Sequence, residues 1–386
     1  MELFKASNQW STRPADERFW DLKEMSNACF AYKNSACEST VENSDLRVEA
    51  RDGEVLLSGR SGVNARLSHW AFGQFSRSVN APPSYLRTLP ATLAAQNLNH
   101  GLADLDGKAT QKLMFHQNGN LVLRSVTSEN YGRVWNADVI DRLMNYLPAG
   151  WQVPPARPCG KPGERTRKAT EKDCLYSKKQ GLSINPGDLI APAGLYASDH
   201  DMFMFLVNEN HGVDDGTGHE LNRGFFLWNS EVGDKSFGLM TFLYDAICGN
   251  HIVWGAKGVM ELRIRHTKHA EGRAFQSLSM DLRRYSDSSA SDMQAKIQAA
   301  RKFEFGKTKE EAVENLLTQL FKRKVGIPQK TLELAYDRAE ASPRYGAPTT
   351  AWGFANGLTE LSQELTHTDA RVNMDRAAGK VLEIAF

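Results

Sequence analysis

Apolar and polar positions form their most informative pattern in the middle of the chain. Gly224–Glu231 is short and aromatic, which favours a buried strand. Lys235–Cys248 is apolar on nearly all sides, and Gly249–Asn250 is a typical helix end, so this stretch predicts a buried helix. Two further strands are expected at His251–Trp254 and Met260–Thr267.

The last of these strands has two unlike faces, because side chains alternate along a strand. Met260, Leu262, Ile264 and His266 share one face. The other face carries Glu261, Arg263, Arg265 and Thr267. The pattern therefore predicts an antiparallel sheet with one basic face, packed on a buried helix.

Local turn and cap signals extend this picture to the rest of the chain. Hairpins are expected around Asn118-Gly119 and Asp52-Gly53, and a helix over Ala65–Arg77. Thr308–Glu311 is a capping box that opens the first of several C-terminal helices. We therefore predict an α+β fold in four regions, namely an N-terminal α+β region with hairpins (1–150), a basic flexible loop or insertion (151–180), a central sheet with its buried helix (181–267) and a helical C-terminal region (268–386).

Charge and composition exclude several classes of protein. The net charge of the 386 residues is only +1, so a nucleic-acid site would have to be a local patch. Val153–Gln180 is such a patch, because it holds eight basic and three acidic residues and carries +5. No apolar run approaches the roughly 20 residues that span a bilayer, and the N-terminus has no signal pattern.

The cysteines and the common cofactor motifs narrow the classes further. The five cysteines are irregularly spaced and form no CxxC pair, so neither a zinc ribbon nor a disulfide framework is indicated, and a cytoplasmic location is expected. The chain has no GxxxxGK[ST], no GxGxxG after a strand and no GxSxG. We therefore expect no cofactor and assign no catalytic residue.

A set of short motifs runs through most of the chain, and includes Gln74-Phe75-Ser76-Arg77, Tyr131 with Trp135-Asn136, Asn229-Ser230-Glu231-Val232-Gly233, Cys248-Gly249-Asn250, Arg263-Ile264-Arg265-His266-Thr267 and Trp352-Gly353-Phe354. Their combination resembles the phage, prophage and plasmid proteins grouped as the domain-of-unknown-function family numbered 932. The resemblance implies an origin in mobile elements and, by association, a role in DNA replication or recombination. It implies no particular reaction.

Several basic and aromatic residues are candidates for contact with nucleic acid. Arg263 and Arg265 point to the same side of a strand, and with Lys268 they suit consecutive phosphates. The alternative is that this face of the sheet is simply exposed to solvent, with Glu261 neutralising part of its positive charge. Single-strand binders add exposed aromatics, and the place of Tyr131 at the start of a helix favours exposure. The remaining candidates are Trp135, Arg124, and Arg165, Arg167 and Lys168 of the basic loop.

Polar residues also lie inside or at the ends of apolar elements, where they need partners. Asn229, Glu231, Asn250 and His266 are expected to form a hydrogen-bonded network that joins helix to sheet. The alternative is an acid/base or metal site built on Glu231 and His266. A Cys248 thiolate beside a histidine is disfavoured, because that cysteine ends a very apolar helix.

A second polar stretch is dense in acids and histidines, but its spacing matches no standard metal motif and favours a polar loop. It contains Asp199, His200, Asp201, His211, Asp214, Asp215, His219 and Glu220.

The leading hypothesis is a non-enzymatic protein that binds single-stranded DNA and, as a homo-oligomer, anneals complementary strands. No membrane partner is expected. One alternative is a metal-dependent nuclease that uses Asp199, Asp201, Glu231 and His266. The other is a host-takeover or anti-defence interaction protein without catalysis.

Overall fold

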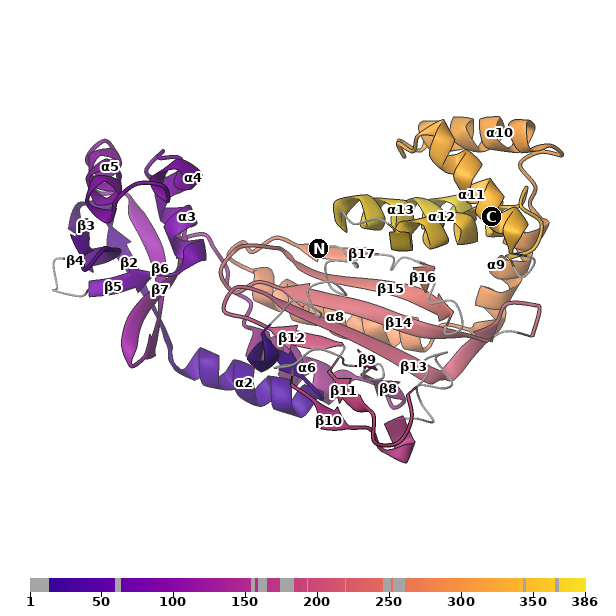
Figure 1. The fold of residues 1–386 in the computed structure, drawn as a ribbon, viewed down its shortest axis with the longest axis horizontal. Coiled ribbons are helices and arrows are strands. Elements are labelled where there is room, and N and C mark those ends of the chain that lie inside the picture. Colours follow the sequence, from indigo (N-terminus) through magenta and orange to yellow (C-terminus); the bar gives the residue numbers. More distant parts are fainter. Residues whose placement is uncertain are drawn as a thin grey trace.

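The computed structural model of the protein describes residues 14–59, 64–153, 157–158, 165–173, 184–192, 194–218, 220–245, 251–252, 261–342, 345–364 and 368–386. Two large β-sheets lie side by side along the long axis of the molecule, and a group of helices follows at the far end (Figure 1). The mixed α+β class predicted from the sequence is confirmed.

The central sheet has eight strands, all paired antiparallel. These strands are β1 (Arg18–Phe19), β8 (Trp151–Gln152), β12 (Leu195–Ala197), β13 (Met202–Asp214), β14 (Glu220–Asn229), β15 (Phe237–Asp245), β16 (His251–Ile252) and β17 (Glu261–Ile264). Their order is β1-β12-β13-β14-β15-β16, with β17 also paired to β15 and β8 to β13. The edge strands β1 and β17 are therefore separated by four others.

The buried helix predicted over Lys235–Cys248 is wrong, because Phe237–Asp245 is the central strand β15. This strand is apolar on both faces, since both faces of the sheet are covered, and a short apolar run does not reveal its period. Gly238 pairs with Trp228 on β14, and a Cβ at Gly238 would lie 2.1 Å from the indole Cζ2. Only glycine fits under that ring, and such glycine–aromatic pairs are a device of sheets.

Three helices pack on one face of the central sheet, namely α2 (Leu22–Asn34), α6 (Asn136–Tyr146) and α8 (Ala270–Ser286). Their apolar sides share a core with Met204, Leu227 and Leu239 of the sheet. The opposite face carries a buried cluster of mostly aromatic side chains, which are Tyr196, Phe203, Phe205, Val207, Phe226, Trp228, Met240 and Phe242.

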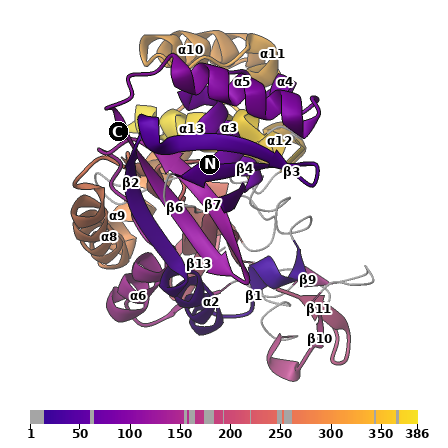
Figure 2. The same ribbon diagram turned by 90° about the vertical axis from the view of Figure 1, so that its left-hand side faces the viewer.

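The smaller sheet has six strands, which are β2 (Ala36–Glu42), β3 (Leu46–Arg51), β4 (Glu54–Gly59), β5 (Asn64–Leu67), β6 (Thr110–Asn118) and β7 (Asn120–Thr127). Helices α3 (His69–Ser78), α4 (Pro83–Leu86) and α5 (Ala91–Ala103) pack against it, and Figure 2 shows them above the sheet. Both expected hairpins are present, with positive φ at Gly119 and at Asp52-Gly53. The helix expected from Ala65 begins only at His69, because Ser68 caps it and the preceding residues form β5.

Short strands β9 (Arg157–Pro158), β10 (Arg167–Lys168) and β11 (Leu189–Ala191) form a third sheet. The single-turn 3-10 helices are η1 (Ala15–Glu17), η2 (Asn43–Asp45) and η4 (Glu383–Ala385). Residues 1–150 thus contribute to both large sheets, because β1, α2 and α6 belong to the central sheet and its helices.

The C-terminal region is helical, as the sequence predicts, with α9 (Ala290–Lys302), α10 (Lys309–Lys322), α11 (Gln329–Ala341), α12 (Ala351–Glu364) and α13 (Thr368–Leu382). Their core includes Val213, Leu221 and Leu243, which lie at one end of the central strands. β14 is ten residues long, so its other end is roughly 30 Å away, and that end carries the polar turns described next. Within the described ranges, none of the helices is long and apolar enough to cross a membrane.

Candidate functional site

The candidate site lies where the central sheet meets the smaller one, at the end of β14 remote from the C-terminal helices. The turn from β14 to β15 is held there by hydrogen bonds from α3 and from the segment between β7 and α6. Gln74 Nε2 donates to the carbonyl of Val232 at 2.7 Å, and Tyr131 Oη donates to that of Ser230 at 3.1 Å. Polar side chains therefore join the two sheets.

A buried ion pair lies at the centre of this seam. Arg124 of β7 and Glu231, just after β14, approach to 3.4 Å, and their side chains are 3% and 2% exposed. Arg124 also donates to the carbonyl of Asp199, and Glu231 Oε1 accepts the backbone N–H of Asn136 at 2.8 Å. Burial raises the pKa of Glu231, and the charge of Arg124 opposes that rise. Loss of either partner would leave a buried charge uncompensated.

The network expected around Asn229 and Glu231 extends to residues that the sequence analysis did not assign to it. Asn229 Nδ2 donates to the carbonyl of Val134 at 2.7 Å and to Asn136 Oδ1 at 2.8 Å. Arg133 donates to the backbone carbonyl of Glu231 and to the carboxylate of Glu38. The fourth residue expected in this network, Asn250, lies outside the described residues.

His266 belongs to a separate contact beside this network. Its ring stacks on Tyr131, with centroids 5.1 Å apart, and its Nδ1 lies 3.1 Å from the carbonyl oxygen of Gly132. Burial lowers the pKa of His266 to about 4, so the imidazole is neutral at physiological pH. A neutral histidine held in this way acts as a packing group.

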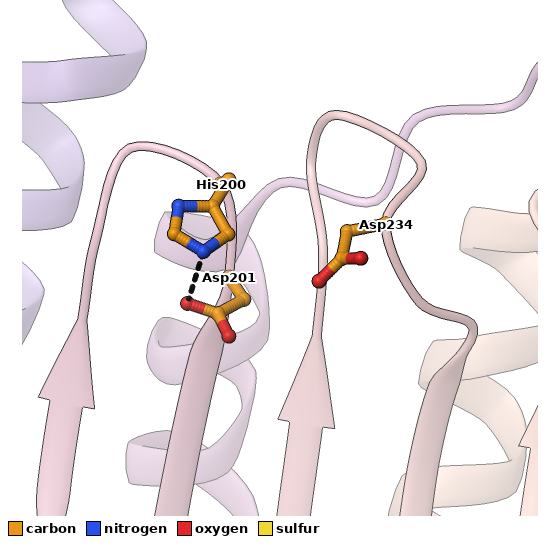
Figure 3. Close-up of side chains that lie close together, drawn as sticks. All are labelled: His200, Asp201 and Asp234. Atoms are coloured by element: carbon orange, nitrogen blue, oxygen red, sulfur yellow. Dashed lines mark ion pairs between the residues drawn. The ribbon is translucent and has the colours of Figure 1, made fainter. Parts of the chain in front are cut away.

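A second cluster occupies the tips of two neighbouring turns (Figure 3). Ligand-type atoms of His200, Asp201 and Asp234 lie within 4.8 Å of one another, which is a geometry that a metal ion could use. However, Lys235 Nζ lies 2.9 Å from Asp201 Oδ2 and 3.1 Å from Asp234 Oδ2. Asp201, which is fully buried, also accepts hydrogen bonds from Tyr196 Oη and Ser198 Oγ. The Lys235 ammonium therefore takes the position that a metal cation would need.

The residues proposed for a nuclease are consequently divided among several different contacts. The Asp199 carboxylate lies 2.7 Å from His200 Nδ1, and this hydrogen bond is the main cause of its lowered pKa. Asp201 forms an ion pair with Lys235, Glu231 forms one with Arg124, and the His266 ring stacks on Tyr131.

The rest of the acid- and histidine-rich stretch is an extension of the sheet rather than a loop. Asp214 ends β13, and Glu220 begins β14. Asp215 forms an ion pair of 2.6 Å with Arg301 of α9. His219 lies outside the described residues, and the structure does not describe the side chain of His211.

The first group of predicted phosphate ligands lies on an exposed edge at the end of β17 and the start of α8. Arg263, Arg265 and Lys268 are all exposed. The Arg263 guanidinium pairs with Glu261, as does Arg376 of α13. Arg273 of α8 adds a fourth exposed cation and donates to Thr267 Oγ1 at 2.6 Å.

The second predicted group lies on the opposite side of the central sheet. Arg165 donates to the carbonyl of Arg18 at 2.9 Å, and Arg167 makes two contacts of 2.7 Å with Asp173. Lys168 is exposed on the same short strand, β10. Because β1 and β17 are five strand spacings apart, roughly 24 Å, this group and the exposed edge do not form one continuous surface.

The remaining candidates, Arg124, Tyr131 and Trp135, are not available for base stacking. Arg124 is buried in its ion pair, and the ring of Tyr131 lies against His266 and the guanidinium of Arg133. Lys33 and Arg133 lie over the ring of Trp135, which is partly buried. The exposure expected for Tyr131 is therefore not observed.

Sequence reasoning missed Arg133, Asn136 and Lys235 as members of the site. The first two contact Glu231 across more than 90 positions of the chain, so no local pattern reveals them. The acidic neighbour Asp234 could have suggested that Lys235 belongs to a polar cluster. Lys235 was instead taken as the start of a buried helix, because an apolar run follows it.

Comparison with known proteins finds one family match, which covers most of the central sheet and the C-terminal helices. Residues 193–379 match the model of the family described as Domain of unknown function (DUF932). This match runs from β12 into α13, and includes the His200 cluster, Glu231 and the exposed basic edge. No curated protein and no solved structure matches the chain. Residues 193–379 therefore form a domain of the DUF932 family of domains of unknown function.

Proposed function

We propose that the protein binds single-stranded DNA by its phosphates, along an edge made by Arg263, Arg265, Lys268 and Arg273, here called the basic edge. The observation that carries this proposal is the concentration of four exposed cations within eleven residues at the end of β17 and the start of α8. A local positive patch can attract a polyanion although the whole chain has a net charge of only +1.

The geometry of the basic edge suits contact with a flexible backbone. Arg263 lies on β17, and Arg265 lies one residue beyond the end of that strand, where the chain turns toward α8. Arg265 and Lys268 make no side-chain hydrogen bond or ion pair with any described residue, so their charges are available. Arg263 is partly neutralised by Glu261, and this ranks it below the other three.

Fluorescence anisotropy with labelled single strands over a salt series tests this proposal. Four phosphate contacts predict a slope of log affinity against log salt of about −3, so affinity falls about 50-fold between 50 and 200 mM salt. The double variant Arg265→Ala/Lys268→Ala should lower the magnitude of the slope by about 1.4. The matched control is Lys322→Ala/Lys330→Ala, which removes two exposed lysines from α10 and α11.

Absence of binding at low salt, or binding without a salt slope, would refute DNA binding. An unchanged slope in the Arg265/Lys268 variant would refute this edge as the site. Equal or tighter binding of duplex would refute the preference for single strands. Annealing is tested by fluorescence transfer between complementary strands, together with the mass of the assembly in solution.

The metal-dependent nuclease stays a prediction with weaker support, because Lys235 holds the cation position between Asp201 and Asp234. Metal analysis of the purified protein, followed by cleavage assays with and without chelator, tests it. The interaction-protein alternative is tested by capture of partners from host lysate.

A further inference from the structure

A cavity of about 320 Å³ lies at the seam between α2, α6 and the turn after β12, and the basic edge contributes nothing to it. Its lining combines apolar groups with polar ones and includes two nearly buried side chains, Glu231 and Asn136, which are 2% and 3% exposed. The remaining lining residues include Asp16, Glu17, Cys29, Tyr32, Ser198 and Asp199. Its volume is that of a small-molecule site.

Carboxyl groups dominate the charge of this cavity. Asp16, Glu17, Asp199 and Glu231 line it, and the Arg124 guanidinium, which pairs with Glu231 at 3.4 Å, offsets one of these four charges. Walls of one sign favour a ligand of the opposite sign, so a cationic ligand is attracted and a phosphate or carboxylate is repelled. This polarity is opposite to that of the basic edge, so the cavity serves a different ligand from DNA.

The spacing of these carboxyl groups excludes a metal ion as the natural occupant. In the described part of the chain, the His200, Asp201 and Asp234 cluster is the single group whose ligand atoms come within 4.8 Å of one another. No three of the four cavity carboxylates come as close as that, and a metal site needs its ligands at about 2.0–2.6 Å from the ion. They suit an organic molecule that meets them at separate points.

Asn136 provides an independent indication of a ligand. Its Oδ1 accepts from Asn229 Nδ2 at 2.8 Å, while its Nδ2 has no acceptor among the residues that the structure describes. The Asn136 side chain lines the cavity and is only 3% exposed, so this donor has little access to water outside the cavity. Because the amide oxygen faces Asn229, the free Nδ2 is the group left to face the cavity. It calls for an oxygen acceptor on the ligand.

The hydrogen bonds around Glu231 prepare it to receive a cation. The Asn136 backbone N–H and Arg124 hold its two carboxylate oxygens, and the burial of the group excludes most water. A carboxylate oxygen can accept more than one hydrogen bond, so each keeps capacity for a ligand N–H. Preorganised acceptors of this kind cost little reorganisation on binding.

We propose that this cavity binds a small organic cation, an ammonium or guanidinium compound that also carries an oxygen acceptor for Asn136. The cationic group lies between Asp199 and Glu231, and its oxygen accepts from Asn136 Nδ2. The proposal is independent of DNA binding, because the cavity shares no residue with the basic edge.

Calorimetric titration of the full chain with three probes tests the proposal. L-arginine amide has both the cation and the carbonyl oxygen, agmatine has the same guanidinium without the carbonyl, and L-glutamate is the anionic control. We expect L-arginine amide to bind about tenfold more tightly than agmatine, because one hydrogen bond is lost, and L-glutamate not to bind. Asn136→Ala should remove the difference between the first two probes.

Asp199→Asn and Glu231→Gln should each weaken both cationic probes about tenfold or more. The matched control is Asp214→Asn, which changes an exposed acid at the far end of β13. If Glu231→Gln fails to fold, Asp199→Asn still tests the proposal. The Asp199 side chain is 50% exposed and is not part of the buried Arg124–Glu231 pair, so this variant is expected to fold.

Three results would overturn the proposal. The first is that neither cationic probe binds, and the second is that L-glutamate binds as well as they do. The third is that MnCl₂ alone binds and is lost with Asp199→Asn, which would make the cavity a metal site. A failure of DNA binding in the basic-edge assay would leave all three readouts unchanged.

Discussion

Replacement of Glu231 by alanine removes the counter-ion of a guanidinium that has almost no access to water. The two side chains are 2% and 3% exposed, so among the described residues the charge left on Arg124 would keep only the carbonyl of Asp199 and the ring face of Tyr32 as partners. Removal of one member of a buried pair costs about 3–5 kcal/mol of unfolding free energy. This is a large part of the roughly 5–15 kcal/mol that stabilises a typical protein.

Hydrogen–deuterium exchange resolves this effect to the seam. A local loss of about 3 kcal/mol should speed exchange roughly 100-fold in β7, in the first turn of α6 and in the turn after β14. The double variant Arg124→Met/Glu231→Met should recover most of the loss, because it buries no charge. The control is Arg66→Ala, since the Arg66–Glu54 pair is more than half exposed on Arg66 and is expected to be worth less than about 1 kcal/mol.

The reasoning would be refuted if Glu231→Ala cost no more than Arg66→Ala. It would also be refuted if the losses of the two single variants simply added in the double variant, because that would show that Arg124 and Glu231 do not interact.

Three further predictions concern other parts of the seam. Burial holds the pKa of His266 at about 4, below the ordinary 6.5, so its stabilising contribution is complete above pH 6.5 and is lost as pH falls toward 4. Denaturant titrations at a series of pH values should show a loss of about 3 kcal/mol in the free energy of unfolding. In the His266→Gln variant the free energy of unfolding should depend much less on pH over this range. A pH dependence equal to that of the wild type would contradict the prediction. Burial raises the pKa of the Cys29 thiol, so iodoacetamide should modify the exposed Cys37 much faster, and peptide mapping that finds equal rates would contradict it. Lys235→Met should cost about 3 kcal/mol or more, because the fully buried Asp201 loses its cation, and an unchanged denaturation midpoint would contradict the role assigned to Lys235.

The parts of the fold that local signals specify could be predicted from the sequence. The turns at Gly119 and Gly53 need positive φ, and the Thr308 cap is a side-chain contact within one turn of helix. Strand β15 could not be predicted in this way, because its two covered faces remove the alternation that identifies a strand. Its one usable signal was Gly238, which is costly within a helix but is required under the Trp228 ring.

The site was predictable only in part, for a related reason. Asn229 and Glu231 are polar residues in an apolar setting, so a need for partners could be inferred. Which partners they find depends on how β7 and α6 reach the central sheet, and this is a property of the whole fold. The same holds for the basic residues, since their separation across the sheet follows from strand order rather than from spacing in the chain.

The pairing of β1 with β12 also constrains the order of events during synthesis. Arg18 pairs with Tyr196, while every strand of the smaller sheet lies between Ala36 and Thr127. At roughly 5–20 residues per second, the ribosome takes on the order of 10–40 s between making β1 and making its partner. The smaller sheet can close during this interval, whereas the N-terminal strand and the apolar side of α2 must wait. During this interval their apolar surface is exposed, and we expect chaperones to bind the nascent chain mainly at this stage.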